Sequence, residues 1–100
     1  MHGVVRRYEF DPVHSETVDR EVNQTLVPTL VKVEGLVAYY WLDSRNGRGA
    51  SVSIYEDEAG ALESNRLLDS FVKKHLPMIS APEVTIGEVK ARIPEPCSED

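Results

Sequence analysis

Two polar residues that could do chemistry share one helical stripe in the second half of the chain. Asn65 and His75 follow the spacing at which Ala61, Leu68 and Val72 recur, so we expect both on the buried face of a helix. A polar group on such a face costs free energy unless it finds a hydrogen-bond partner. A side-chain amide there can donate to a developing oxyanion on a phenolic substrate, and an imidazole can act as a general base or as a metal or haem ligand. Asn65 and His75 are therefore the candidate catalytic residues.

Both residues also have a purely structural interpretation, which the sequence leaves open. Neighbouring backbone groups can satisfy an amide such as that of Asn65. His75 falls in the last turn of the expected helix, where an imidazole can cap the helix and interact with its dipole.

Aromatic residues form a second candidate set, because their rings can stack on a flat ligand. The candidate substrate-binding residues are Tyr39, Tyr40, Trp41 and Tyr55, and Tyr8 can line the same volume. The competing interpretation places these rings in the core or in an interface. The sequence thus allows an aromatic small molecule as a ligand without requiring one.

Composition and motifs argue against several other classes of protein. The 100 residues carry 11 Lys and Arg against 17 Asp and Glu, a net charge of −6, and no basic cluster, which argues against a nucleic-acid partner. The longest uncharged apolar stretch, residues 35–42, is far shorter than the roughly 20 residues of a membrane span, so we expect no membrane partner. No phosphate loop, nucleophile elbow, paired-His motif or Ca²⁺ loop occurs, so we expect no metal and no cofactor. A single cysteine, Cys97, and the lack of a signal segment predict a cytoplasmic protein.

The elements that must position these residues alternate along one small domain. Periodicity predicts strands over 3–10, 36–42, 50–55 and 83–93, and helices from Ser15 to within 32–35 and from after Asp57 to Leu76. Pro28 should loosen the first helix near its last turn, and Asn46-Gly47 should form a tight hairpin turn. The order β-α-β-β-α-β predicts an α+β, ferredoxin-like fold, with a four-stranded antiparallel sheet and both helices on one face. We expect this domain over residues 1–93, followed by a disordered acidic tail at 94–100.

The strand over residues 36–42 is apolar on both faces. Strict alternation puts Val37, Tyr39 and Trp41 on one face, and Leu36, Ala38, Tyr40 and Leu42 on the other. The helices can cover only one of the two sets, and the other would leave an apolar patch of the kind that marks an interface. We therefore predict a homodimer in which two copies pair through their sheet faces.

Four segments of the chain resemble the dimeric α/β-barrel superfamily, and within it the antibiotic-biosynthesis-monooxygenase group. They are GLVAYYWLD at 35–43, SVSIYED at 51–57, AGALESN at 59–65 and PEVTIGEV at 82–89, within a resemblance that covers about residues 3–93. The resemblance implies the ferredoxin-like fold and face-to-face pairing into a dimeric α/β barrel. Several unrelated activities share this fold.

Two branches of the superfamily have members whose site residues are partly matched here. In the cofactor-independent monooxygenases an Asn, a Trp four residues later and an Arg polarise a phenolic or anthrone-like substrate in a pocket between sheet and helices. Asn65 matches the Asn, Asp69 stands at the Trp position, and Lys90 or Arg92 is the candidate for the Arg. The haem-degrading branch uses a helix His ten residues after a Trp, together with an Asn on the first strand. His75 matches the His, but Asn65 stands at the Trp position and residues 3–10 contain no Asn.

The resulting functional hypothesis is a cofactor-independent monooxygenase that acts on an aromatic or quinol-like small molecule. In this hypothesis Asn65 orients the substrate oxygen, and a tyrosine or His75 handles its proton. The alternative is a non-catalytic dimeric module that binds a small ligand or is purely structural, and the loss of the helix Trp favours it. Haem binding or degradation through His75 is a third hypothesis.

Overall fold

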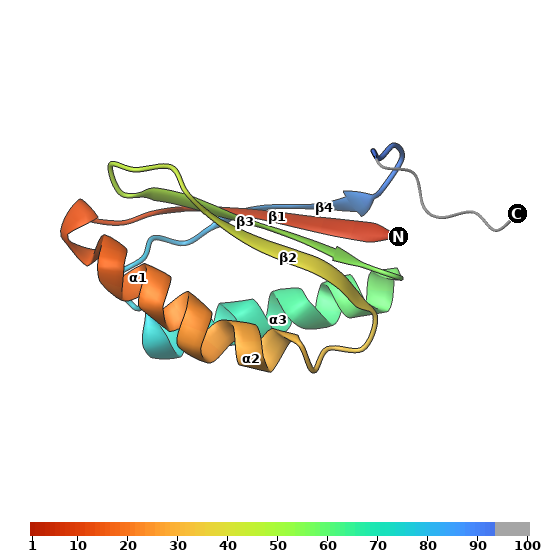
Figure 1. The fold of residues 1–100 in the computed structure, drawn as a ribbon, viewed down its shortest axis with the longest axis horizontal. Coiled ribbons are helices and arrows are strands. Elements are labelled where there is room, and N and C mark those ends of the chain that lie inside the picture. Colours follow the sequence, from red (N-terminus) through yellow and green to blue (C-terminus); the bar gives the residue numbers. More distant parts are fainter. Residues whose placement is uncertain (94–100) are drawn as a thin grey trace, which may run out of the picture.

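The computed structural model describes residues 1–93 and has two layers, one of strands and one of helices. The strands are β1 (His2–Glu9), β2 (Leu36–Asp43), β3 (Arg48–Tyr55) and β4 (Glu83–Glu88). They form one antiparallel sheet in the order β2-β3-β1-β4, and all the helices cover one of its faces (Figure 1). The predicted ferredoxin-like α+β fold is confirmed. The tail predicted at 94–100, which includes Cys97, lies outside the described residues.

The first helical segment is built from three helix types in succession. A single turn, η1 (Pro12–His14), leads into α1 (Ser15–Glu21), which continues as the π-helix η2 (Val22–Leu26) and then as α2 (Val27–Leu30). Pro28 cannot donate a hydrogen bond to the carbonyl of Gln24, and its ring would crowd that carbonyl in a regular α-helix. The helix widens into a π turn just before Pro28, which agrees with the predicted loosening of the helix. The segment ends at Leu30, earlier than predicted.

The connection between β2 and β3 is a short turn with three consecutive positive φ angles. Arg45, Asn46 and Gly47 have φ values of 70°, 54° and 76°. A Cβ atom at Gly47 would lie only 1.9 Å from the carbonyl oxygen of Phe10, so this position requires glycine. The hairpin predicted from Asn46-Gly47 is confirmed, and both strands extend further toward the turn than the sequence indicated.

A β-bulge near the start of β2 changes which side chains share a face. The pairing with β3 shifts between Leu36 and Ala38, so Leu36 lies opposite the buried Tyr55 and packs against the core. Val37 is 47% exposed instead of pointing inward with Tyr39. Strict alternation was therefore wrong for these two residues, because the bulge inserts one extra position.

The core fills the space between the sheet and the helices. It includes Val4 and Tyr8 of β1, Tyr55 of β3, and side chains of the first helical segment. The long helix α3 (Glu58–His75) is capped by Asp57, whose side chain accepts from the Gly60 N–H at 3.0 Å. Its buried stripe is Gly60, Ala61, Ser64, Leu68 and Phe71.

β4 is shorter than predicted, since it ends at Glu88 rather than at Ile93. In the described part of the chain, no helix is both long and apolar enough to span a membrane.

Candidate functional site

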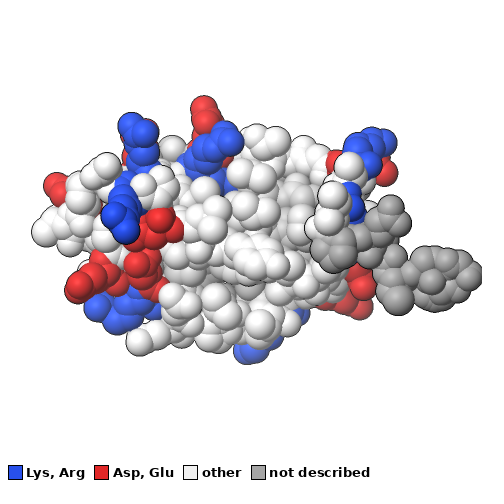
Figure 2. Space-filling view, turned by 45° about the horizontal axis from the view of Figure 1, so that its top comes forward, with Lys and Arg blue, Asp and Glu red and all other residues white. Residues whose placement is uncertain are grey.

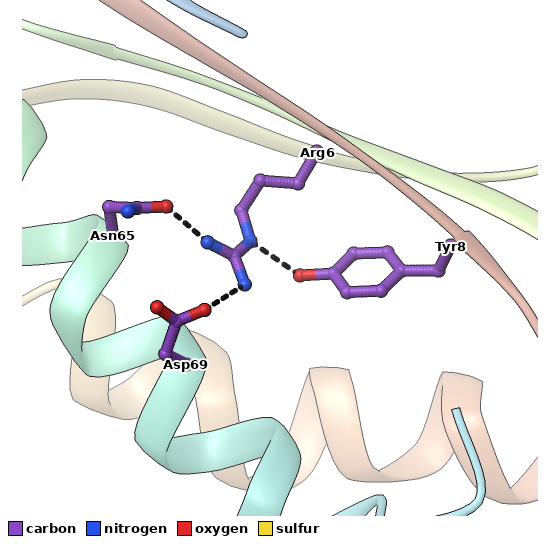
Figure 3. Close-up of polar contacts among 4 residues, drawn as sticks. All are labelled: Arg6, Tyr8, Asn65 and Asp69. Atoms are coloured by element: carbon purple, nitrogen blue, oxygen red, sulfur yellow. Dashed lines mark hydrogen bonds and ion pairs between the residues drawn. The ribbon is translucent and has the colours of Figure 1, made fainter. Parts of the chain in front are cut away.

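Strand β1 carries an arginine into the interior of the domain. Alternation along the strand turns Val4, Arg6 and Tyr8 toward the helices, and the Arg6 side chain is completely buried. A buried guanidinium must be paired and hydrogen-bonded. Nε of Arg6 donates to the Tyr8 hydroxyl at 2.6 Å, Nη2 donates to Oδ1 of Asp69 at 2.8 Å, and Nη1 donates to Oδ1 of Asn65 (Figure 3).

Helix α3 supplies two of these three partners. Asn65 and Asp69 are four residues apart, so both project from one side of the helix toward Arg6 (Figure 3). Because a guanidinium only donates hydrogen bonds, the Asn65 atom that faces Arg6 must be its oxygen, which leaves the NH₂ group as a donor for another acceptor. The Asp69 side chain is 50% exposed, whereas its partner Arg6 is completely buried. Asp69 therefore stands where the polar cluster meets solvent.

Burial raises the pKa of two phenols at this site, and the Arg6 guanidinium keeps its charge. Burial raises the pKa of Tyr8, and the hydrogen bond and charge of Arg6 only partly offset that effect. Burial also raises the pKa of Tyr39. Burial lowers the pKa of Arg6, but its contacts with Tyr8 and Asp69 outweigh that effect and raise the pKa overall. The site combines one fixed positive charge with hydroxyl groups that hold their protons.

An apolar cavity adjoins Tyr8 in the interior. Its volume is about 10 Å³, room for about one water molecule. Its walls come from both layers and consist of Tyr8, Val18, Val22, Leu26, Tyr39, Trp41, Leu68, Phe71, Val72, Leu76 and Ile79. The Trp41 indole N–H donates to Oδ1 of Asp19 at 2.8 Å, and the ring lies 6.0 Å from that of Tyr8. A flat ligand would be surrounded by aromatic rings here, but only after side chains move aside.

An outer cleft lies between α3 and the loop over residues 77–82. It has a volume of about 430 Å³ and is lined by Asp69, Val72, Lys73, Pro77, Ile79, Ser80, Ala81 and Pro82. Val72 and Ile79 line both this cleft and the inner cavity, so the two spaces adjoin at these residues. The loop is fastened to β1, because the Ser80 N–H donates to the Glu9 carbonyl at 2.9 Å and the Glu9 N–H donates to Ser80 Oγ at 3.1 Å.

Some buried polar groups of the interior still have hydrogen-bonding capacity. The hydroxyls of Ser53, Tyr55 and Ser64 have no hydrogen-bond partner among residues 1–93. Buried hydroxyls normally find a partner in protein or in ordered water. These groups could therefore bind a water molecule or a polar atom of a ligand.

The structure brings only part of the predicted site together. Asn65 lies in the Arg6 cluster, and Tyr39 and Trp41 line the inner cavity. Tyr55 is completely buried in the core. Tyr40 is 60% exposed on the opposite face of the sheet, because the alternation of β2 separates it from both neighbours.

The expectation that His75 is buried is wrong. His75 is exposed in the last turn of α3, its ring stacks on Phe71 at 5.1 Å, and Nδ1 lies 3.8 Å from Glu21 Oε1. The buried stripe passes to Leu76 as the helix ends, so His75 lies at the edge of the core. An imidazole in this position does not fit an axial haem ligand inside the domain.

The two candidates for the arginine of the resemblance lie beyond the end of β4, which stops at Glu88. Lys90 is exposed and pairs with Glu88 at 3.1 Å, and Arg92 donates to the sulfur of Met1 at 3.3 Å. Arg6 instead is the arginine that contacts Asn65. Its alternation with Val4 and Tyr8 was the signal that could have identified it, because those neighbours mark the inner face of the strand.

Comparison with solved structures places this architecture in a known fold. No protein-family model matches the sequence, and no curated protein matches it. SnoaB, a cofactor-independent oxygenase from Streptomyces nogalater, has a TM-score of 0.67 at 15% identity, over 94% of this chain and 97% of that chain. The ActVA-Orf6 monooxygenase of Streptomyces coelicolor, solved with nanaomycin D, has a TM-score of 0.69 at 13% identity, over 92% and 89%.

A third similar structure is a dimeric ferredoxin-like protein from an uncultured marine organism. Its TM-score is 0.70 at 15% identity, over 92% of this chain and 97% of that chain. These likenesses show that the chain has the ferredoxin-like fold that the sequence resemblance implied. The neighbours with this fold include a cofactor-independent oxygenase and a monooxygenase.

Proposed function

We propose that the chain is a cofactor-independent monooxygenase that oxidises an aromatic or quinol-like small molecule. The observation that carries this proposal is the fully buried Arg6 guanidinium, which contacts Asn65 and Tyr8 beside an aromatic cavity. Well-packed apolar side chains often stabilise a protein as well as a buried ionic network does. A charged cluster beside a cavity is therefore a candidate functional site, and two structural neighbours are oxygenases.

The cluster suits a substrate that becomes an oxyanion before it reacts. When an anthrone or phenol loses a proton, Arg6 and the NH₂ group of Asn65 stabilise the negative oxygen. A ring carbon then gives its electron pair to dioxygen and forms a peroxide. Loss of water from the protonated peroxide leaves a carbonyl, so dioxygen supplies one oxygen to the product and one to water. Tyr8 is neutral and can donate its proton to the peroxide oxygen.

Oxygen uptake with the anthrone dithranol tests this proposal, with the spontaneous oxidation of dithranol subtracted. We expect Asn65→Ala to lower kcat/KM by about 10²-fold, the usual effect of removing one oxyanion donor. Asn23→Ala is the matched control, since the Asn23 amide bonds the Asp19 carbonyl on the outside of the first helical segment. Equal turnover by the Asn65 variant and the control would refute the assignment.

A second candidate is a non-catalytic dimeric module. The observation that favours it is the small size of the inner cavity, because a filled interior needs no substrate. In that case dithranol and related quinols would cause no oxygen uptake above the spontaneous rate, although the protein would still be dimeric.

The open face of the sheet supports a homodimer as the functional oligomeric state. Tyr40 and Leu42 are 60% and 52% exposed on the face that the helices leave uncovered. Figure 2, which brings the sheet side forward, shows a largely uncharged centre with charged side chains around its edges. Face-to-face pairing of two copies would bury this patch, and one similar structure is a dimeric ferredoxin-like protein.

A further inference from the structure

Asp69 is the one residue of the Arg6 cluster that also lines the outer cleft. Its Oδ1 accepts from Arg6 Nη2 at 2.8 Å, while half of its side chain is exposed. Its second oxygen, Oδ2, has no hydrogen-bond donor among residues 1–93. A molecule that enters between α3 and the loop 77–82 therefore meets a carboxylate before it reaches Arg6.

The charge of the cluster limits what can bind there. Arg6 supplies one positive charge and Asp69 one negative charge, so the pair has no charge left to balance an anionic ligand. Binding a substrate that is already an anion would place two negative charges against one buried guanidinium. A substrate that is neutral on binding leaves the pair intact.

From this geometry we infer that Asp69 is the general base of the site, and that its substrate is an acidic phenol or enol that binds in the neutral form. This inference rests on the proposed function. The O–H or C–H bond of the substrate breaks, its proton forms a new O–H bond with Asp69, and the electron pair remains on the substrate. The substrate oxyanion then replaces the Asp69 carboxylate as the partner of Arg6. The total charge of the site does not change during this step.

The surroundings of Asp69 are compatible with this exchange. The titratable groups that face it are Arg6 and Tyr8 of β1 and Lys73 one turn further along α3. The loop 77–82 contains no titratable side chain. Asp69 is the one carboxylate among the described residues that line this cleft, and Lys73 and Arg6 are both cations. No second carboxylate of the cleft lining within residues 1–93 therefore competes with Asp69 for the proton.

A coloured phenol tests the transfer without requiring oxygenation. We would add para-nitrophenol to the protein in weak buffer, at a pH below the pKa of the free phenol. The yellow phenolate absorption and the protons released to the buffer are recorded together. For the wild type we expect phenolate to form with almost no proton release, because Asp69 keeps the proton. For Asp69→Asn we expect release of about one proton per phenolate formed.

Glu63→Gln is the matched control, because Glu63 is an α3 carboxylate that pairs with Arg66 on the surface, and it should behave as the wild type. Should Asp69→Asn fail to fold, difference infrared spectroscopy of the wild type still decides, since binding must produce the band of a protonated carboxyl group. Full proton release by the wild type, a bound phenol that stays neutral, or no binding would each overturn the inference. Proton capture without oxygen uptake from dithranol would support the role of Asp69 while contradicting the monooxygenase proposal.

Discussion

Asp69 accepts a hydrogen bond from Arg6 across the boundary between the helix layer and the sheet, with 2.8 Å between Oδ1 and Nη2. One partner is completely buried and the other is half exposed. The pair therefore joins the interior of the domain to the cleft beside α3.

The first prediction concerns the stability of the pair. Asp69→Leu leaves the buried guanidinium without its counter-charge, so we expect the free energy of unfolding to fall by about 1–3 kcal/mol. Arg6→Met combined with Asp69→Leu removes both charges and should recover most of that loss. Urea denaturation of the single and double variants measures the difference. If the double variant were less stable than Asp69→Leu alone, the unpaired charge of Arg6 would not be the cause of the lost stability.

The single tryptophan gives a direct signal for ligands in the cavity. Trp41 is the only Trp in the sequence and lines the inner cavity. We expect an aromatic ligand such as dithranol to change the intensity or the maximum of its emission, because the ring would contact the ligand. Tyr40→Ala, on the opposite face of the sheet, should leave the change intact. A binding isotherm by calorimetry without any change in emission would place the ligand elsewhere.

Disruption of the open sheet face should separate the subunits. Leu42→Glu places a charge in the patch that the helices leave uncovered, so burial against a second copy becomes unfavourable. Native mass spectrometry should show a dimer for the wild type and a monomer for this variant. Leu62→Glu is the control, because Leu62 is similarly exposed, at 51%, but lies on α3. A wild-type monomer would contradict the dimer.

Alkaline pH should destabilise the protein through Tyr39. Burial raises its pKa above the value of about 10 found in an unfolded chain. The stabilisation is thus complete below that value and is lost as the pH rises through the range in which the unfolded phenol ionises. We expect the free energy of unfolding to fall above about pH 10, and less steeply in Tyr39→Phe than in Tyr40→Phe. Equal slopes in the two variants would contradict this explanation.

His75 is expected to have no part in the chemistry. Its ring lies at the exposed end of α3 beside Glu21, so His75→Ala should change kcat/KM for dithranol by less than about twofold. Addition of haem should give the same Soret spectrum with the wild type and with this variant. A Soret shift that vanishes in His75→Ala would instead support the haem hypothesis.

The sequence predicted the fold well, because the relevant signals are local. Alternation in the strands and periodicity around Ala61 and Leu68 reflect the pattern of burial along single elements. The bulge at Val37 is different, since it depends on the pairing with β3 and leaves the apolar character of the segment unchanged. Alternation alone therefore misassigned Leu36 and Val37.

The candidate site was predicted less well, because its contacts join distant parts of the chain. Asn65 was recognised from its place on α3, but its partner Arg6 is 59 residues away in sequence. Helical spacing also placed His75 on the buried stripe, although Leu76 and not His75 is buried where the helix ends. Periodicity reports the direction of a side chain along its element, whereas burial depends also on what lies opposite.

Mass spectrometry of the product formed from dithranol under heavy-isotope dioxygen tests the central claim most directly. The account predicts one heavy oxygen per product molecule, formed above the spontaneous rate by the wild type and at least about tenfold more slowly by Arg6→Met. The same rate of labelled product with and without the protein would contradict the account.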